Sequence, residues 1–271
     1  MTKLAGKSGD VYVADLLLSN CEVAWDSGTH GTASLNTTAT YVKVGSGSAK
    51  IEIDTAIETG DIIAYDTITE ADISDYSHIL CWAYSSVTTE LLDYRIGVGT
   101  TGSGAAPTTT VEVPALTATT WKYCHCTLAA GTFAATEAGT VIGLESNANG
   151  ADGDIIYLDD IRAAKVISGI NSWNLDYVTD ALETTDFVSA GARAYIAGPS
   201  GWSGSFSGYK DGAPLSIGSE YGLELAESAT VTQMWLGNAI ITGVHPSTGF
   251  DGVVTYSYDF TGTGVLTIAS A

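Results

Sequence analysis

The chain has 271 residues, enough for two domains that each bury a core without disulfide or metal staples. Thr, Ser, Gly, Ala, Val, Ile and Tyr dominate and Leu-rich helical stretches are missing, so the composition predicts an all-β protein. Ten basic residues against 31 acidic ones give a formal charge of −21, and such a surface repels nucleic-acid phosphate and anionic membranes.

The opening MTKLAGKSGD has no apolar stretch of signal-peptide length after its lysines. No later run approaches the roughly 20 apolar residues that a membrane span needs. We therefore expect a soluble protein that is made in a cytoplasm.

Between Leu16 and Arg162, short apolar runs alternate with turn clusters such as DSGTHG and GSGS. The predicted strands are CEVAW, TYVKV, AKIEI, IIAYDTI, HILCWAY, DYRIGV, TVEV, WKYCHCTL, TVIGLE and IIYLDDI. This many short strands in about 150 residues predicts a β-sandwich or jelly roll.

Two segments are tolerable as short helices: ITEADISDY and the stretch from Val178 to Thr184. Neither is long enough for a helical bundle. The segment TEADISDYS fits better as a capped turn before the buried strand HILCWAY, because Thr, Asp and Ser side chains bind nearby backbone amides.

The four cysteines are Cys21, Cys81, Cys124 and Cys126. Within WKYCHCTL, strand alternation places the last two thiols on one face and His125 on the other, which is poor geometry for one zinc ion. We expect reduced, half-buried cysteines that pack as small hydrophobic side chains.

After Lys165 the residue pattern changes. SGWSGSFSGY alternates small or polar residues with aromatic ones, as a strand packed on one face does. The long strand pair VTQMWLGNAIITGV and GVVTYSYDFTGTGVLTIA follows, so this half is predicted to be a second all-β unit.

This second half resembles the tail tube proteins of long-tailed bacteriophages. The matching features are Trp173 and Asp176 in SWNLDY, the ETTDF element at Glu183–Phe187, AYIAGPSGWSGSFSGYKDG at 194–212 and the ending YSYDFTGTGVL. The resemblance implies a tail-tube-like β-sandwich or barrel domain.

Phage proteins of this type often open with a segment like LAGKSGDVYV, which here lies at Leu4–Val13, while its expected continuation begins near Val166. We therefore predict a discontinuous tail-tube-like domain, residues 1–14 and 165–271, with a jelly-roll domain inserted at 15–164. The insert, counted from Asp15 to Ala164, has five basic and 20 acidic residues, a net charge of −15 that suits a solvated display module.

The insert resembles jelly-roll modules of the carbohydrate-binding type in NCEVAW, GSGSAKIEI, HILCWAYSS and IIYLDDIRA. In that family an early Glu and a closing-strand carboxylate often hold a structural calcium ion, and the matching positions are Glu22 and Asp159. Backbone carbonyls of the turn from Gly45 to Ser48 would suit calcium as further ligands. Ordinary surface carboxylates are the alternative.

Exposed aromatic rings could stack on sugars, and the candidates are Trp25, Tyr65, Tyr84 and Tyr94. The alternative for these residues is packing in a core or between domains. Trp82 lies in the apolar strand ILCWAY and is expected in the core.

No grouping of Ser, His and Asp has a nucleophile-elbow pattern, and GVGTTGSG lacks the lysine of a phosphate loop. Carboxylate pairs arise by chance among 31 acidic residues. We therefore expect no enzymatic activity, and no cofactor besides calcium.

The tail-tube resemblance implies a virion structural protein, located in the phage tail after assembly in the host cytoplasm. Its copies would form stacked homohexameric rings around a lumen through which DNA passes without specific binding, and would contact other tail or capsid proteins. The jelly roll would face outward and could touch host-surface glycans. Two alternatives stay open: a capsid decoration protein on the same scaffold, and a carbohydrate-binding adhesin that forms no rings.

Overall fold

The computed structural model describes residues 9–54, 57–100, 109–128, 133, 138–147, 153–185, 192–228, 233–250 and 252–270. Strands dominate, and the one helical element in these ranges is the short 3-10 turn η2 (Ala39–Tyr41), so the all-β prediction is confirmed. No helix in the described ranges has the length and hydropathy needed to span a membrane.

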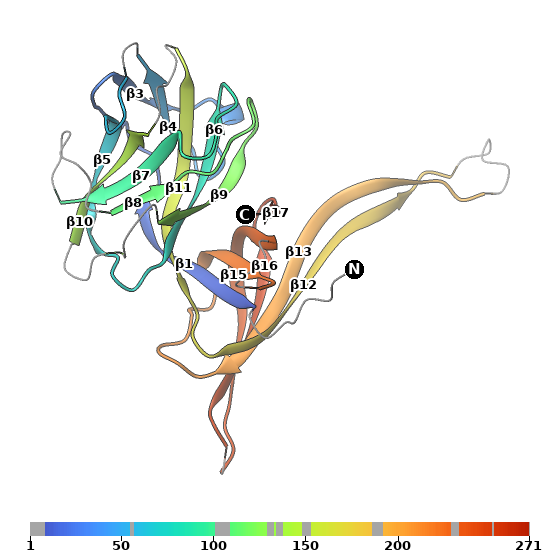
Figure 1. The fold of residues 1–271 in the computed structure, drawn as a ribbon. Coiled ribbons are helices and arrows are strands. Elements are labelled where there is room, and N and C mark those ends of the chain that lie inside the picture. Colours follow the sequence, from blue (N-terminus) through green and yellow to red (C-terminus); the bar gives the residue numbers. More distant parts are fainter. Residues whose placement is uncertain are drawn as a thin grey trace. The chain divides into compact units, whose positions relative to one another are not determined.

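The chain forms two compact units (Figure 1). Unit 1 consists of Met1–Val11 and Ile167–Ala271, and unit 2 is the continuous segment Tyr12–Val166. Residues 4–8 of the opening segment Leu4–Val13 lie outside the described ranges.

The two ends of unit 2 are neighbours in space. Tyr12 pairs with Val166 in an antiparallel ladder, and directly beyond them the N–H of Ile167 donates to the carbonyl of Val11 at 2.8 Å. A segment whose ends meet in this way adds to a host domain without stretching the host backbone.

Unit 2 is built from short antiparallel strands. These are β1 (Asp10–Ser19), β2 (Asp26–Ser27), β3 (Gly31–Asn36), β4 (Ser48–Ile53), β5 (Ile62–Asp72), β6 (His78–Ser85), β7 (Tyr94–Gly99), β8 (Thr109–Glu112), β9 (Lys122–Leu128), β10 (Ala138–Ser146) and β11 (Ile155–Val166). The spatial order is β3-β4-β11-β6-β9-β8-β7-β10-β5-β2, and β1 pairs with the end of β11. Alternate residues such as Ile51, Ile79, Ile96 and Leu144 fill one buried core.

Two predicted strands of unit 2 are wrong. CEVAW is not a strand because Cys21 has a φ of 55°, in the left-handed region, which breaks the extended backbone. TYVKV is not a strand because η2 occupies its start and the N–H groups of Lys43 and Val44 donate to Asp159 instead of a neighbouring strand. Strand β3, which pairs with β4, was not predicted.

The predicted turn before HILCWAY is confirmed for residues 73–77 of TEADISDYS, whereas residues 69–72 are the end of β5. The N–H of Ser74 donates to Asp72 Oδ1 at 2.9 Å, and the N–H of Tyr76 donates to the carbonyl of Ile73 at 3.0 Å. A side-chain oxygen thus satisfies the backbone at the point where β5 ends.

Unit 1 contains the long strands β12 (Ile170–Glu183), β13 (Tyr195–Tyr209) and β15 (Gln233–Ser247), together with β14 (Glu220–Ala226), β16 (Thr255–Gly262) and β17 (Thr267–Ser270). They pair in the order β12-β13-β16-β15-β14, with β17 beside the start of β15 and the first part of β1 on β14. The stretch 178–183, a helix candidate in the sequence, is strand.

The unit 1 sheet has two different faces, as the alternation in SGWSGSFSGY predicts. Trp202 and Phe206 are buried, and Tyr258 and Phe260 of β16 pack on the same side. The serines between them on β13 point the other way and are partly exposed.

Candidate functional site

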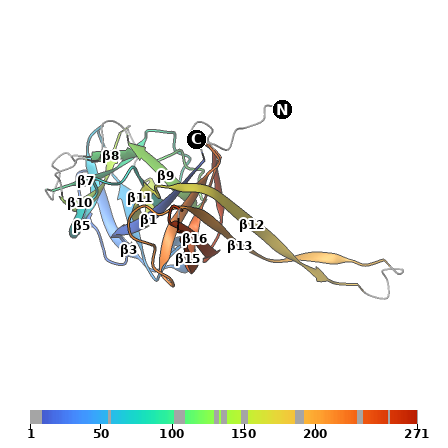
Figure 2. The ribbon, with the colours of Figure 1, turned by 90° about the horizontal axis from the view of Figure 1, so that it is seen from below.

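The β12–β13 hairpin extends past the rest of the unit 1 sheet as an arm, visible in both ribbon views (Figures 1 and 2). Strand β16 pairs with β13 only from Ser203 to Tyr209, so residues 195–202 have β12 as their one strand partner in the described ladders. Two-stranded hairpins are marginally stable in water unless something packs against them.

The arm exposes large apolar side chains. Their exposed fractions run from 47% to 61%, and they are Tyr177, Val178, Leu182, Tyr195 and Ile196. Leu182 and Ile196 are cross-strand partners, so they form one continuous apolar patch. Such a patch on an arm that the described residues do not cover is typical of an interaction surface.

The polar face at the base of the arm is made of small side chains. Register places Ser205 opposite Asp259 and Ser207 opposite Ser257, and Asn174 Oδ1 accepts from the N–H of Ser205 at 2.7 Å. Strands β12, β13, β15 and β16 contain neither Lys nor Arg. Asp259 Oδ2 contacts His245 Nε2 of β15 at 2.9 Å. This face therefore offers hydrogen-bonding groups and a carboxylate–imidazole pair, and these strands supply no Lys or Arg for a phosphate.

The two predicted calcium ligands contact the same loop, from Lys43 to Gly47. Glu22 accepts from the N–H and the hydroxyl of Ser46, both at 2.6 Å, and these bonds lower the pKa of its carboxyl, the hydroxyl most. Asp159 is fully buried, and its Oδ2 accepts from the N–H groups of Lys43 at 2.7 Å and Val44 at 3.0 Å. The loop thus presents N–H groups, not carbonyls, to these carboxylates.

Asp159 Oδ1 is buried and has no hydrogen-bond partner among the described residues. Burial raises the pKa of this carboxyl to about 6, with a smaller contribution from neighbouring Asp160, against the lowering effect of the two N–H groups. Oδ1 is an oxygen that a cation could use, whereas both oxygens of Glu22 already accept. The donor set therefore fits calcium in part, through Asp159.

The four proposed sugar-stacking aromatics are in different environments. Trp25 and Tyr94 are buried in the core cluster of unit 2, so neither ring presents a face to solvent. Tyr65 is partly exposed on β5. Tyr84 lies outside the core cluster and contacts Tyr41 edge-on, with ring centroids 5.3 Å apart.

Tyr84 belongs to an aromatic cluster on the β6–β9–β11 face that points away from the core. Its members are Tyr41, Trp82, Tyr84, Trp121, Tyr123 and Tyr157. Tyr41 stacks on Tyr157 at 4.5 Å, and Lys43 Nζ lies 5.2 Å from the Trp82 ring centroid. Trp82 is buried as expected, but in this cluster. The signal in the sequence was that both alternating faces of HILCWAY are apolar or aromatic.

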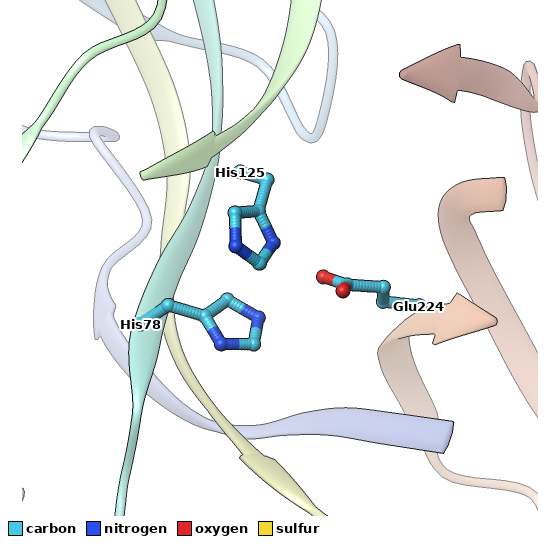
Figure 3. Close-up of side chains that lie close together, drawn as sticks. All are labelled: His78, His125 and Glu224. Carbon is cyan, nitrogen blue, oxygen red and sulfur yellow. The ribbon is translucent and has the colours of Figure 1, made fainter. Parts of the chain in front are cut away.

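His78 of β6 and His125 of β9 lie side by side on this same face, with ring centroids 4.1 Å apart (Figure 3). Tyr12 packs edge-on against His78 at 4.9 Å. Within unit 2, the pair adds two imidazoles to the packed aromatic surface of these strands.

All four cysteines are free and fully buried, so they are more buried than expected. Cys81 and Cys126 Sγ atoms are 3.9 Å apart, and burial raises the pKa of the Cys124 thiol. Thiols in this state pack as small apolar groups.

No family model and no curated protein matches the chain. Among solved structures, it is similar to a chain of the tail of an empty gene transfer agent particle, determined with C6 symmetry: TM-score 0.34, 16% identity, 40% of this chain and 87% of that chain. It is also similar to a chain of the native gene transfer agent virion: TM-score 0.32, 16% identity, 39% and 88% covered. These values do not establish a family for the chain.

Proposed function

We propose that the chain is a structural subunit of a phage-type virion, specifically a tail tube protein whose copies form stacked hexameric rings around a DNA channel. The observation that carries this proposal is the β12–β13 arm. Residues 195–202 pair only with β12, and the arm exposes apolar side chains, so it is only marginally stable in an isolated chain. The same features suit it to packing against other copies.

The polar face of the unit 1 sheet suits the lining of such a channel. DNA binds tightly where basic side chains neutralise phosphates and release counterions. A surface of Ser, Thr, Asn and Asp on strands that have no Lys or Arg offers no permanently charged cation to neutralise phosphates, and the His245 imidazole of β15 is already paired with Asp259. DNA would therefore slide along this face without adhering.

Unit 2 is proposed as a jelly-roll display module on the outside of the tube. Its ends are neighbours, which suits an insertion, and its predicted counterpart in the sequence has a charge of −15 that keeps it solvated. In this role it contributes no chemistry, contacts host-surface glycans weakly if at all, and holds calcium through Asp159.

The assembly proposal predicts that polar substitutions on the arm abolish rings. Leu182→Asp with Ile196→Asp puts two charges into one cross-strand pair, which any packed interface would bury. We expect stacked rings or tubes of the wild-type protein in negative stain, and monomers of the double variant. Ile217→Asp, at an equally exposed apolar position away from the arm, is the matched control and should assemble normally.

Unchanged assembly of the arm variant, or a wild-type protein that stays monomeric at high concentration and is absent from purified tails, would remove the proposal. Binding to capsids rather than tails would favour the decoration protein. Glycan-array hits from a chain that forms no rings would favour the adhesin.

Excision of unit 2 is predicted to leave a folded unit 1. Removing residues 12–166 and joining Val11 to Ile167 through a short Gly/Ser linker closes ends that are already hydrogen-bonded. Circular dichroism should show a cooperative, β-rich melt. An aggregated product with no melting transition would contradict the insertion model.

A further inference from the structure

Unit 1 has a preformed pocket at the base of the arm. Its volume is about 330 Å³, and its lining includes Tyr177, Ser200, Trp202, Gly262, Thr263 and Gly264. A cavity of roughly 150 Å³ already holds a benzene ring. The pocket is therefore large enough for an aromatic side chain.

Two contacts fix the Trp202 side of the pocket. Trp202 Nε1 donates to the carbonyl of Gly264 at 2.9 Å, which fixes the indole. A Cβ atom at Gly262 would lie 2.0 Å from the Trp202 ring, so the backbone there approaches the ring as only glycine permits. This side of the pocket therefore loses little conformational entropy when the pocket is filled.

At the turn between β15 and β16, Phe250 is 104% exposed, more than any other large apolar side chain among the described residues. The N–H of Gly252 donates to the carbonyl of Gly249 at 3.2 Å, so Phe250 follows the first residue of a tight turn. Val253, three residues further along the chain, is also exposed. A fully exposed aromatic ring on a hairpin turn has the form of an interface anchor.

The anchor and the pocket lie at opposite ends of β16. Thr255, near the anchor, pairs with Tyr209, whereas Thr261, at the pocket, pairs with Ser203. At about 3.3 Å per residue, this strand separates them by roughly 20 Å. Phe250 therefore does not reach the pocket of its own chain.

The end of β16 near Phe250 has charged residues of both signs. Lys210, the only lysine between Ile167 and Ala271, donates its N–H to the carbonyl of Val254, and the acidic residues Asp211 and Asp251 follow Lys210 and Phe250 in the sequence. At the other end, Glu220 accepts from the hydroxyl of Thr263, which lines the pocket, at 3.3 Å. The contact proposed below therefore depends on the fit of an apolar ring to the pocket and not on charge.

We propose that Phe250 of one copy inserts into the Trp202 pocket of the next copy. This contact is heterologous: each copy gives an anchor and receives one, and such contacts build rings when the rotation closes and filaments when it does not. The inference rests on the proposed function, because it supplies one contact of the assembly.

The test uses two surface variants and their mixture. Phe250→Ser removes the anchor, and Ser200→Leu fills the pocket, because residue 200 lies on the same strand face as Trp202. In sedimentation velocity, each variant should lose at least tenfold in self-association relative to wild type. Ile217→Ser and Ser200→Ala are matched controls that should associate like wild type.

The mixture identifies head-to-tail contact. The Phe250→Ser chain keeps an open pocket and the Ser200→Leu chain keeps an anchor, so an equimolar mixture should form dimers and stop there. Wild-type association that both variants retain would overturn the inference and leave the tube proposal standing. Association that depends on both residues, but without rings in micrographs or protein in tails, would overturn the tube proposal alone. A wild-type chain that never self-associates would overturn both.

Discussion

Replacing Trp202 by Ala is expected to lower the free energy of unfolding of unit 1 by about 3–5 kcal/mol. The indole is buried, packs on Phe260 with ring centroids 5.9 Å apart, and lies against the backbone of Gly237 and Gly262. Its removal leaves a cavity that strands fixed by their ladders do not collapse to fill. It also leaves the Gly264 carbonyl without its indole donor.

Hydrogen exchange resolved by peptide would show this loss in unit 1 while protection in unit 2 stays unchanged. Tyr177→Ala removes an exposed ring from the same pocket and serves as the control, with an expected cost below about 1 kcal/mol. Gly262→Ala should resemble Trp202→Ala, because its Cβ would overlap the indole. Equal, small effects of all three would contradict the packing described for this sheet.

The features of the fold that were predicted from sequence are those that alternation encodes. In SGWSGSFSGY, Trp202 and Phe206 are four positions apart with small residues between them, and the structure buries both rings while the serines between them face the other way. CEVAW is mostly apolar, but Cys21 is in the left-handed region and its N–H donates to Ser19 Oγ at 3.2 Å, outside the segment. Periodicity therefore identified strands and missed this backbone reversal.

The candidate sites were predictable only in part, because strand patterns do not say what covers a face. The resemblance predicted that Glu22 and Asp159 act together, and the structure brings both to the loop from Lys43 to Gly47. This loop presents backbone N–H groups to them, not the expected carbonyls. Trp25 was a candidate for sugar stacking, yet its ring is in the core. Phe250 was not singled out, since a lone Phe between turn residues says nothing about exposure.

The buried charge of Asp159 gives the last prediction. Its pKa is raised from the model-compound value of 3.8 to about 6, chiefly by burial. Between these two pH values the folded state holds a proton that the unfolded state has released. In excess chelator, this group therefore stabilises unit 2 fully below pH 3.8, and its contribution is lost as the pH rises through 6.

Asp159→Asn removes that titration and keeps an oxygen for the N–H groups of Lys43 and Val44. In chelator at pH 7, we expect this variant to be more stable than wild type by roughly 2–3 kcal/mol, and the difference to vanish near pH 4. Chemical denaturation across this pH range, with hydrogen exchange to assign the transition to unit 2, measures it. Glu22→Gln is the control. The pKa of this partly exposed carboxyl is lowered, so its ionised form stabilises the folded state and the effect of pH on stability has the opposite sign.

Calcium should reverse the order of the two proteins. A cation bound at Oδ1 compensates the buried carboxylate, and any ligand selective for the folded state stabilises it in proportion to occupancy. Millimolar calcium should therefore raise the melting temperature of wild type at pH 7 and leave Asp159→Asn unchanged, while chelation lowers it again. If chelator leaves the melting temperature of wild type unchanged and the purified protein contains no metal, Asp159 does not bind calcium. If wild type nevertheless stays less stable than Asp159→Asn, the buried carboxylate destabilises unit 2 at pH 7 and no bound cation compensates for it.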